Sequence, residues 1–292
     1  MSAIVYYITL PFIYLLSLVP FPLLYLLSDG LYLVLYHVVG YRKEVINENL
    51  TNAFPEKTMP EIIVLQKKFY RYFCDLLLET FKTLTISRNT MLKHCSLDPA
   101  AEKIFSGFAA ENKSLIIVMG HKGNWEWAGN TFGICCKHQL YVIYHPLANK
   151  YFNGLIYKMR RRFGSKLIPM KDTFRQIIKN KNELNAIAFI ADQSPNPEKA
   201  YWINFLNQDT AVFTGTEKIA KMINYPIVYI SVKRLKRGYY TLLAETLLVP
   251  PYAGGEGDIT ELHTRKLESD ILSQPETWLW THKRWKHKPV NI

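Results

Sequence analysis

Lysine and arginine are missing from the first 41 residues, so all 36 basic residues of the chain lie from Arg42 onward. Within that region, Ala3 to Leu27 is apolar apart from threonine, serine and tyrosine side chains. A helix of roughly 24 residues rises about 36 Å, which is enough to cross a bilayer. Pro11, Pro20 and Pro22 each remove a backbone donor, so a kinked or interfacial helix is an open alternative. A buried core helix of a soluble protein is the other.

A basic start and a small-x-small cleavage site, the marks of a cleaved signal peptide, are also missing around this apolar run. We therefore expect residues 1–40 to be retained as a membrane anchor that either spans the bilayer or is embedded in it. Arg42 and Lys43 follow the apolar region directly. The positive-inside rule then predicts that the rest of the chain lies on the cytoplasmic side.

Cysteine is scarce and carries no recognisable pattern. The spacing fits neither a zinc ribbon nor a secreted disulfide scaffold, so we expect thiols of a reducing compartment at Cys74, Cys95, Cys135 and Cys136. The formal net charge of +12 implies an anionic partner, and nucleic acid, acidic lipid or an acidic small molecule would satisfy it equally. Because the basic residues are scattered and no segment resembles a nucleic-acid module, we expect no nucleic-acid partner.

After the anchor, the pattern predicts helices first and an α/β core later. A helix from Tyr41 ends near Phe54-Pro55, and Glu61 to Leu84 has apolar residues at helical spacing. We expect one domain over 41–292, made of a helical lead-in (41–110) and an α/β core (111–292).

Short apolar runs in the core indicate buried strands, with helical stretches between them. These runs are Leu115 to Met119, Leu140 to Tyr144, Ala186 to Ala191 and Ile227 to Val232. Tyr239 to Val249 follows Arg237-Gly238 and is expected as a hairpin partner at a sheet edge. Helices are expected near Asp258–Leu272 and Glu276–Lys286. The predicted fold is α/β, with a largely parallel central sheet flanked by helices.

The stretch GHKGNWE, residues 120–126, follows the first core strand, and a helix is expected to start around Trp125. Ligands in open α/β sheets bind at the carboxyl ends of strands, where this stretch lies. His121 and Glu126 meet only if the chain turns between them, as Gly120 and Gly123 permit. A histidine held by a carboxylate through one ring nitrogen keeps the other as a base. That pair suits proton removal from a hydroxyl or amine that attacks an acyl carbonyl, although the H-x4-E spacing alone is common by chance.

Further blocks make the chain resemble, nearly end to end, the late acyltransferases of lipid A biosynthesis, the lauroyl and myristoyl transferases. They lie within the wider lysophospholipid and glycerolipid acyltransferase superfamily. The matching pieces are residues 41–50, 53–56 and 120–126, Tyr144-His145-Pro146 with Asn149, Arg160-Arg161-Arg162-Phe163-Gly164, Ala191-Asp192-Gln193, Phe213-Thr214-Gly215-Thr216, and PETWLWTHKRWK at 275–286. The wider superfamily usually carries Asp where this chain has Glu126, which favours the lipid A branch.

This resemblance implies transfer of a fatty acyl chain from acyl carrier protein to a hydroxyl of a lipid A precursor, at the inner membrane and without metal or cofactor. It also implies that His121 is the base and Glu126 its partner. Arg160 and Arg162 match the basic R-x-R positions and would stabilise an oxyanion or grip phosphate, unless they form a solvated helix face.

Other residues join the expected site with their alternatives open. Asp192 and Gln193 shape the site or bond the acceptor, or else Asp192 only caps a loop. Gly123 and Asn124 are expected among the substrate-binding and oxyanion groups. The tryptophans near the end suit a membrane interface, and packing in the core is the alternative: Trp278, Trp280 and Trp285.

Two other functions stay open. The same chemistry would serve another membrane lipid, such as a lysophospholipid or an amino-acid-linked lipid. The aromatic stretch Trp125-Glu126-Trp127 and the loop Ser194–Lys199 favour that possibility, because they differ from the forms typical of lipid A enzymes. A more distant hypothesis is a non-catalytic protein that binds lipid or nucleic acid.

Overall fold

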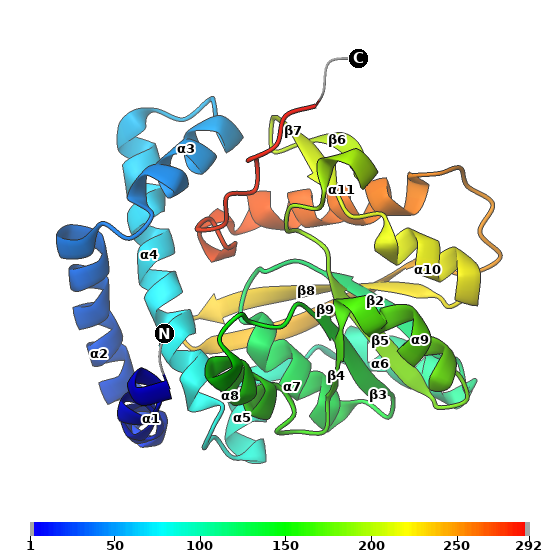
Figure 1. Cartoon of the computed structure of the whole chain (residues 1–292), viewed down its shortest axis with the longest axis horizontal. Helices are drawn as coiled ribbons and strands as arrows, with labels where there is room; N and C mark the ends of the chain where they lie inside the picture. Colours follow the sequence, from blue (N-terminus) through cyan, green and yellow to red (C-terminus); the bar gives the residue numbers. More distant parts are fainter. Residues whose placement is uncertain (1–2, 290–292) are drawn as a thin grey trace.

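A seven-stranded sheet in the order β1-β9-β8-β2-β5-β3-β4 forms the centre of the computed structural model, which describes residues 3–289 (Figure 1). Its strands are β1 (Cys95–Leu97), β2 (Leu115–Met119), β3 (Gln139–Tyr144), β4 (Lys166–Pro169), β5 (Asn185–Ile190), β8 (Ile227–Lys236) and β9 (Tyr239–Leu248). Only β8 and β9 pair antiparallel within this sheet, and its other pairs are parallel. The predicted α/β fold with a largely parallel sheet is confirmed.

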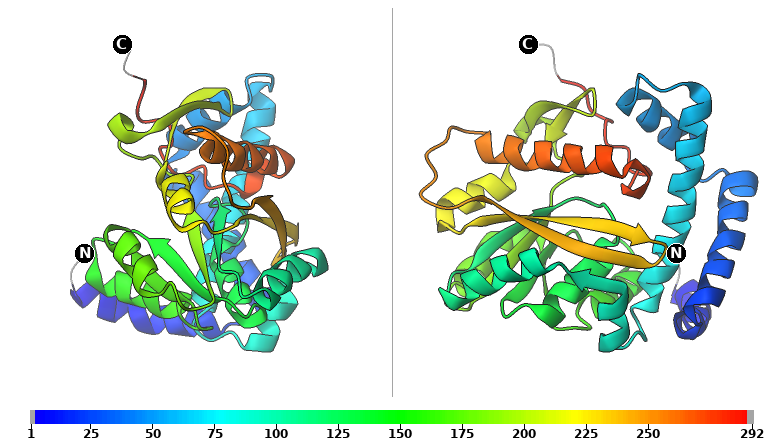
Figure 2. Two further views of the ribbon diagram at one scale, coloured as in Figure 1. Left: turned by 90° about the vertical axis from the view of Figure 1, so that its right-hand side faces the viewer. Right: turned by 180° about the vertical axis from the view of Figure 1, so that it is seen from behind.

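Helices cover both faces of this sheet, and α4 stands across one end of it (Figures 1 and 2). The helices are α1 (Ala3–Leu18), α2 (Phe21–Leu33), α3 (Lys43–Ala53), α4 (Met59–Lys82), α5 (Arg88–His94), α6 (Pro99–Ala110), α7 (Trp125–Cys135), α8 (Lys150–Arg160), α9 (Thr173–Lys179), α10 (Gly215–Ile223) and α11 (Asp258–Ser273). A small antiparallel hairpin, β6 (Tyr201–Phe205) and β7 (Gln208–Val212), lies outside the main sheet.

The central strand β2 is buried along its whole length, as expected for a parallel strand with both faces covered. Its side chains alternate between two core layers. Ile117 and Met119 pack with residues of α6 and α7, whereas Ile116 and Val118 pack with residues of α10 and α11. This packing fixes the carboxyl end of β2 between the layers.

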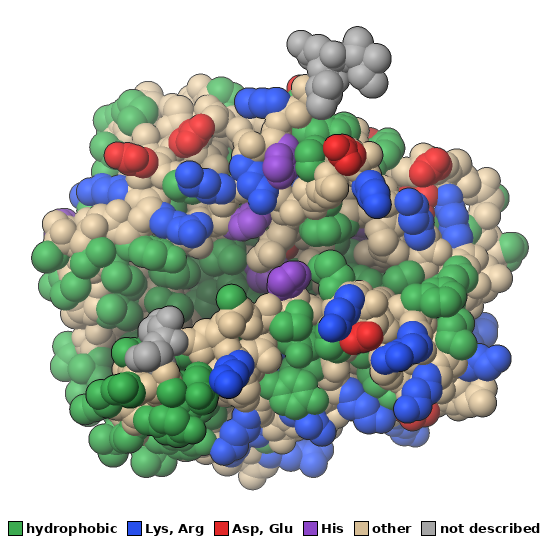
Figure 3. Space-filling model, viewed as in Figure 1, with side chains coloured by type: hydrophobic (Ala, Val, Ile, Leu, Met, Phe, Trp, Pro, Cys, Tyr) green, Lys and Arg blue, Asp and Glu red, His purple; other side chains and the backbone are tan. Residues whose placement is uncertain are grey.

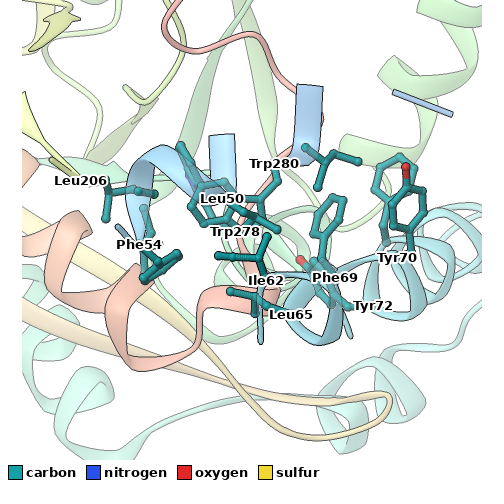
Figure 4. Close-up of a cluster of buried hydrophobic side chains, with 14 of the residues drawn as sticks. Leu50, Phe54, Ile62, Leu65, Phe69, Tyr70, Tyr72, Leu206, Trp278 and Trp280 are labelled. Atoms are coloured by element: carbon teal, nitrogen blue, oxygen red, sulfur yellow. The ribbon is translucent and has the colours of Figure 1, made fainter. Parts of the chain in front are cut away.

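A third apolar cluster joins α3 and α4 to the end of the chain (Figure 4). It includes Leu50 of α3, Phe69 of α4 and the indoles of Trp278 and Trp280, which are buried. The helix α4 begins with a capping box between Thr58 and Glu61, as its sequence favours. Through this cluster the terminal segment, residues 278–286, packs against α4 and toward the sheet.

The apolar N-terminal region forms two helices instead of one. The first helix ends at Leu18 and the second begins at Phe21, after Pro20, so the predicted helix over Ala3 to Leu27 is wrong in its bounds. Proline lacks a backbone donor but suits the first turn of a helix, which is how Pro22 is placed in α2. Among the described residues, one helix is long and apolar enough to cross a membrane: Phe21–Val39, formed by α2 and a π-helical turn (Val34–Val39). Residues 1 and 2 of the expected anchor lie outside the described part.

Two other expectations fail. The strand β9 lies inside the sheet, because β1 pairs along its outer side. The strand β1 belongs to the helical lead-in (41–110), which therefore contributes one short strand besides its helices, and the domain bounds remain a prediction. The expected helix Glu276–Lys286 is a single 3-10 turn, η4 (Pro275–Thr277), followed by irregular chain. That irregular chain lets two tryptophans enter the core, and Lys122 and Trp278 form an isolated antiparallel bridge.

Candidate active site

His121 stands two residues after the end of β2, in the loop that leads to α7. Two glycines shape this loop. A Cβ at Gly120 would lie 3.1 Å from Oδ2 of Asp192 and closer still to Leu267, and Gly123 has φ +59 and faces the carbonyl oxygen of Val232. Only glycine accepts the second conformation freely, and the first close approach also needs a missing side chain. The loop therefore brings His121 against its neighbours.

The carboxylate that holds His121 belongs to Asp192. It follows β5, which pairs in parallel with β2 so that Met119 faces Ile190. Nδ1 of His121 donates to Oδ1 of Asp192 at 2.6 Å, and the backbone N–H of His121 donates to Oδ2 at 2.7 Å. Parallel pairing thus puts the two residues side by side at one sheet edge. Because Nδ1 is the donor, Nε2 keeps its lone pair.

Asp192 is built to stay ionised although it is buried. Burial alone would raise the pKa of Asp192, but the charge of His121 and hydrogen bonds from His121 and Trp278 outweigh burial and lower the pKa to about 2. Nε1 of Trp278 donates to Oδ2 at 2.8 Å. The His121 side chain is 16% exposed and that of Asp192 is 3% exposed, so the ring is reachable and its partner is not.

Glu126 was expected to hold the histidine ring, and this expected contact is wrong. Both Glu126 oxygens accept from Arg160: Nε donates to Oε2 at 2.9 Å, and Nη2 donates to Oε1. Burial raises the pKa of Glu126, but the nearby Arg160 guanidinium and the charge of His121 lower it overall. Glu126 lies in the first turn of α7 and Arg160 ends α8, so the pair joins two helices beside His121. The catalytic role of Glu126 remains a prediction.

Gly123 and Asn124 were expected to contact substrate, but the structure places both in the scaffold of the loop. The Gly123 N–H donates to the carbonyl of Thr277, and its own carbonyl accepts from Tyr72 at 2.6 Å. Asn124 caps α7 by accepting from the Trp127 N–H at 2.9 Å and donates from Nδ2 to Glu79 at 2.8 Å. These backbone and amide groups are occupied, so they hold the loop in place.

Two more residues of the expected site, Arg162 and Gln193, form no hydrogen bond with the His121 or Asp192 side chains among the described residues. The Arg162 guanidinium donates to the carbonyl oxygens of Leu84 and Ile86, which ties the end of α8 to the chain after α4. It thus has a structural role in place of the expected one at an oxyanion or phosphate. Gln193 is exposed beside Asp192, and its contact with substrate stays a prediction.

The terminal segment completes the site. The Leu279 N–H donates to the His121 carbonyl at 3.1 Å, next to the bond from Trp278 to Asp192. Trp278 and Trp280 are 2% and 0% exposed, so for these two the interface interpretation is wrong and the alternative of core packing holds. The indole of Trp285 donates to Thr210 at 2.7 Å and is half-buried. The sequence motif marked this segment as important, but no spacing rule pointed from Trp278 to Asp192.

A narrow apolar cavity lies on the α7 side of the sheet, beside His121. Its walls come from β2, β3, β5, β8 and α7, and every lining side chain is apolar. Trp125 lines it and also contacts the His121 ring edge to face, with 5.1 Å between ring centroids. Gly129 and Phe132 of α7 lie along the same wall. Through Trp125, this apolar cavity adjoins the ring of His121.

Within residues 3–289, no cluster of three or more histidine, cysteine, aspartate or glutamate side chains is arranged to hold a metal ion. At the carboxyl ends of β2 and β5, His121 and Asp192 form a hydrogen-bonded acid–base pair. A partly exposed base next to a narrow apolar cavity suits the transfer of an apolar group to a hydroxyl or amine. The fold and the site thus define an α/β enzyme with a histidine base held by an aspartate.

The chain belongs to the bacterial lipid A biosynthesis acyltransferases, whose family model matches residues 1–287. It is similar to the lipid A biosynthesis lauroyltransferase of Escherichia coli (strain K12), with 22% identity over 281 residues, which cover 94% of this chain and 88% of that protein. The palmitoleoyltransferase of the same strain is 20% identical over 274 residues, 93% of this chain and 87% of that protein. A lipid A biosynthesis acyltransferase of Shigella flexneri matches to the same extent. The predicted family and the acyltransferase class are confirmed.

Proposed function

We propose that the protein transfers a fatty acyl chain from acyl carrier protein to a hydroxyl of a lipid A precursor at the inner membrane. The observation that carries this proposal is the hydrogen bond between Nδ1 of His121 and Asp192 at the carboxyl ends of two parallel strands. Family membership supports the acyl transfer and the lipid A acceptor. The thioester donor follows from the resemblance to the lauroyl and myristoyl transferases.

In the proposed mechanism, Nε2 of His121 takes the proton of the acceptor hydroxyl as its oxygen attacks the thioester carbonyl. Asp192 keeps the ring oriented and stabilises the imidazolium that forms. The tetrahedral intermediate then collapses, the C–S bond breaks, and the imidazolium returns its proton to the leaving thiolate. The products are the ester and the free thiol of the carrier.

We propose that Arg160 stabilises the negative charge that develops on the carbonyl oxygen. Nε and Nη2 of its guanidinium bond Glu126, and Nη1 donates to no atom within the described residues. A donor that is fixed before the reaction contributes more than a mobile one, because no reorganisation is needed in the transition state. In this proposal Glu126 acts by aiming Arg160 and through its charge near His121.

We propose that the donor chain lies along the apolar cavity beside Trp125, with its thioester near His121. Exposed apolar side chains cover α1 and α2, and Figure 3 shows them gathered over this part of the molecule. We propose that this surface lies in the inner membrane, with the catalytic core on its cytoplasmic side as the positive-inside rule predicts.

The test is a transfer assay with purified full-length protein in detergent. Acyl carrier protein charged with laurate, myristate or palmitoleate is mixed with a tetra-acylated lipid A precursor, and the products are weighed by mass spectrometry. We expect the mass of one acyl group to be added, and His121→Ala to abolish the addition. A matched arm with acyl coenzyme A tests the carrier, since equal rates with both donors would contradict dependence on acyl carrier protein.

A second acceptor class is a membrane lipid of another kind, such as a lysophospholipid or an amino-acid-linked lipid. The observation that favours it is the low identity, 20 to 22%, to the relatives named for lipid A. Adding both lipids to the same assay separates the cases. Acylation of the lysophospholipid with none of the lipid A precursor would replace the first acceptor by the second.

A further inference from the structure

Arg284 is a buried cation that the proposed mechanism does not use. It lies in the terminal segment and is only 4% exposed. Within the described part of the chain, its Nε and Nη1 atoms have no hydrogen-bond acceptor. An arginine buried without a partner is costly, because its guanidinium loses water without gaining fixed acceptors. A nearby group must therefore compensate the buried charge of Arg284.

The compensating group borders a small enclosed cavity behind the site. Arg284 and Asp192 both line it, together with His263, and most of the remaining wall is apolar. Its volume of about 10 Å³ is that of about one water molecule. The two side chains therefore border one small space, which has room for a single bridging water, and the charge of Asp192 acts on the guanidinium. Burial lowers the pKa of Arg284 to about 10 against the attraction of Asp192, so the group stays charged at neutral pH.

Among the described residues, the other titratable groups near the His121–Asp192 pair are neutral or paired with each other, so none of them offsets the positive charge of Arg284. The titratable or charged side chains that face the pair come from several elements: Glu126, Arg160, Tyr229, His263, His282 and Arg284. Glu126 and Arg160 balance each other. Burial lowers the pKa values of His263 and His282 to about 4, so both rings are neutral at pH 7. Tyr229 donates to Asp270 and stays uncharged.

We propose that Arg284 is a positioning residue: its buried cation attracts the Asp192 carboxylate from behind and keeps it turned toward Nδ1 of His121. This inference rests on the proposed function, in which His121 is the base. Arg284 touches neither substrate nor the reacting atoms, so it acts only through Asp192. The histidine ring is then held from behind by a relay of Arg284, Asp192 and Trp278, two of which come from the terminal segment.

The experiment compares Arg284→Gln with Arg284→Lys in the full-length protein. Lys283→Gln is the matched control, because it removes a positive charge from the adjacent, exposed position. We expect Arg284→Gln to lower kcat about 10- to 100-fold, part of the roughly 10²- to 10⁴-fold that a general base contributes, with KM for both substrates nearly unchanged. Arg284→Lys recovers most of the loss, and Lys283→Gln behaves as wild type.

The pH profile separates positioning from packing. Without the guanidinium, the His121–Asp192 pair takes up its proton more readily, so the acid limb of kcat/KM moves to higher pH by about one unit in Arg284→Gln. The limb stays in place in Arg284→Lys. NMR titration of ¹⁵N-labelled histidine in the full-length protein, with His121→Gln to identify the signal, shows the same displacement. This readout needs no substrate, so it decides on the inference even if the proposed acyl transfer fails.

An unmoved acid limb and an unmoved His121 titration in Arg284→Gln would overturn the inference, because the loss of kcat would then come from packing alone. A shift in Arg284→Lys equal to that in Arg284→Gln would overturn it too, since the charge would not be the cause. If Arg284→Gln does not fold, Arg284→Met takes its place as the charge-free variant, and the same outcomes support or overturn the inference.

Discussion

Two carboxylates lie near His121, and each has a different partner. Asp192 bonds the ring and backbone of His121, whereas Glu126 bonds Arg160. The glutamate of the H-x4-E motif therefore contacts Arg160 and not the ring. The aspartate that bonds the ring is 71 positions away in the chain and reaches it only because β2 and β5 are neighbours.

Replacing Asp192 by Asn tests this division at the residue level. The amide cannot stabilise the imidazolium and leaves the wrong tautomer available, so we expect kcat to fall about 10²- to 10⁴-fold. The fall should be measured in the transfer assay with saturating donor. Asp209→Asn, an exposed change on β7, serves as the control. Near wild-type turnover by Asp192→Asn would show that the ring is oriented by something else.

At the scale of single elements, most strands and the first long helices could be predicted from sequence. The strand β2 has the predicted bounds, and β8 starts at the predicted residue. The bounds of β3 and β5 differ from the predicted ones by no more than one residue at each end. Buried parallel strands are nearly continuous apolar runs, which is why they stand out. By contrast, β1 is only three residues of mixed polarity, and its pairing with β9 is a long-range contact that no local pattern reveals.

The candidate site was predictable in its members more than in its contacts. His121 and Asp192 both follow apolar strands, so their place at the sheet edge could be predicted. The bond between them could not, because strand order is not written in local spacing. The tryptophans of the terminal segment are of a type that suits a membrane interface, so the sequence favoured that placement. Tertiary packing instead buries Trp278 against Asp192.

The terminal segment supplies a test with a conservative change. Trp278→Phe keeps most of the apolar volume and removes only the N–H donor to Asp192. We expect kcat to fall about tenfold, as for a lost hydrogen bond to a charged group. Trp285→Phe removes an indole bond to Thr210 instead and should leave kcat unchanged. Equal effects of both changes would mean that packing, and not the bond to Asp192, is what matters.

The helix α4 carries a buried carboxylate, Glu79, that links α2 to the catalytic loop. It accepts from Tyr25, Asn124 and Tyr240. Burial and the charge of Asp75 raise the pKa of Glu79 to about 7, although the tyrosine hydrogen bonds oppose them. A carboxyl whose folded pKa is raised binds its proton more tightly in the folded state. Its contribution to stability is therefore full below the ordinary pKa and is lost as pH rises toward 7.

We expect the free energy of unfolding of the wild type to fall between about pH 4.5 and pH 7, by up to roughly 3 kcal/mol from this group. Glu79→Gln removes the titration and should flatten that part of the curve. Denaturant unfolding across this pH range measures both proteins, and Glu111→Gln, at an exposed position, is the control. A Glu79→Gln curve that is parallel to the wild-type curve would contradict the raised pKa.

At the scale of the whole molecule, charge and apolar surface are segregated. Figure 3 shows apolar side chains gathered over α1 and α2 and basic side chains spread over other parts of the same face. Phe12, Leu15 and Leu26 are all more than 60% exposed. An exposed apolar surface of this extent on a helical pair is typical of a membrane contact.

The double change Phe12→Glu with Leu15→Glu tests the membrane contact. Each charge placed in an apolar lipid phase costs about 2.5 to 3.5 kcal/mol, so binding should weaken strongly. Flotation with vesicles of phosphatidylethanolamine and phosphatidylglycerol measures the bound fraction. Leu235→Glu with Leu272→Glu, exposed apolar positions of β8 and α11, is the matched control and should float as the wild type. Full flotation of the first double variant would contradict a membrane role for α1.

The central claim is that this acyltransferase uses His121 to acylate a lipid A precursor. Mass spectrometry of total lipid tests it most directly, on cells that lack the gene and on the same cells carrying either the wild-type gene or His121→Ala. The account predicts that lipid A loses one acyl chain in the deletion, that the wild type restores it, and that His121→Ala, present at equal amounts in the membrane, does not. Unchanged lipid A in the deletion, or full restoration by His121→Ala, would contradict the account.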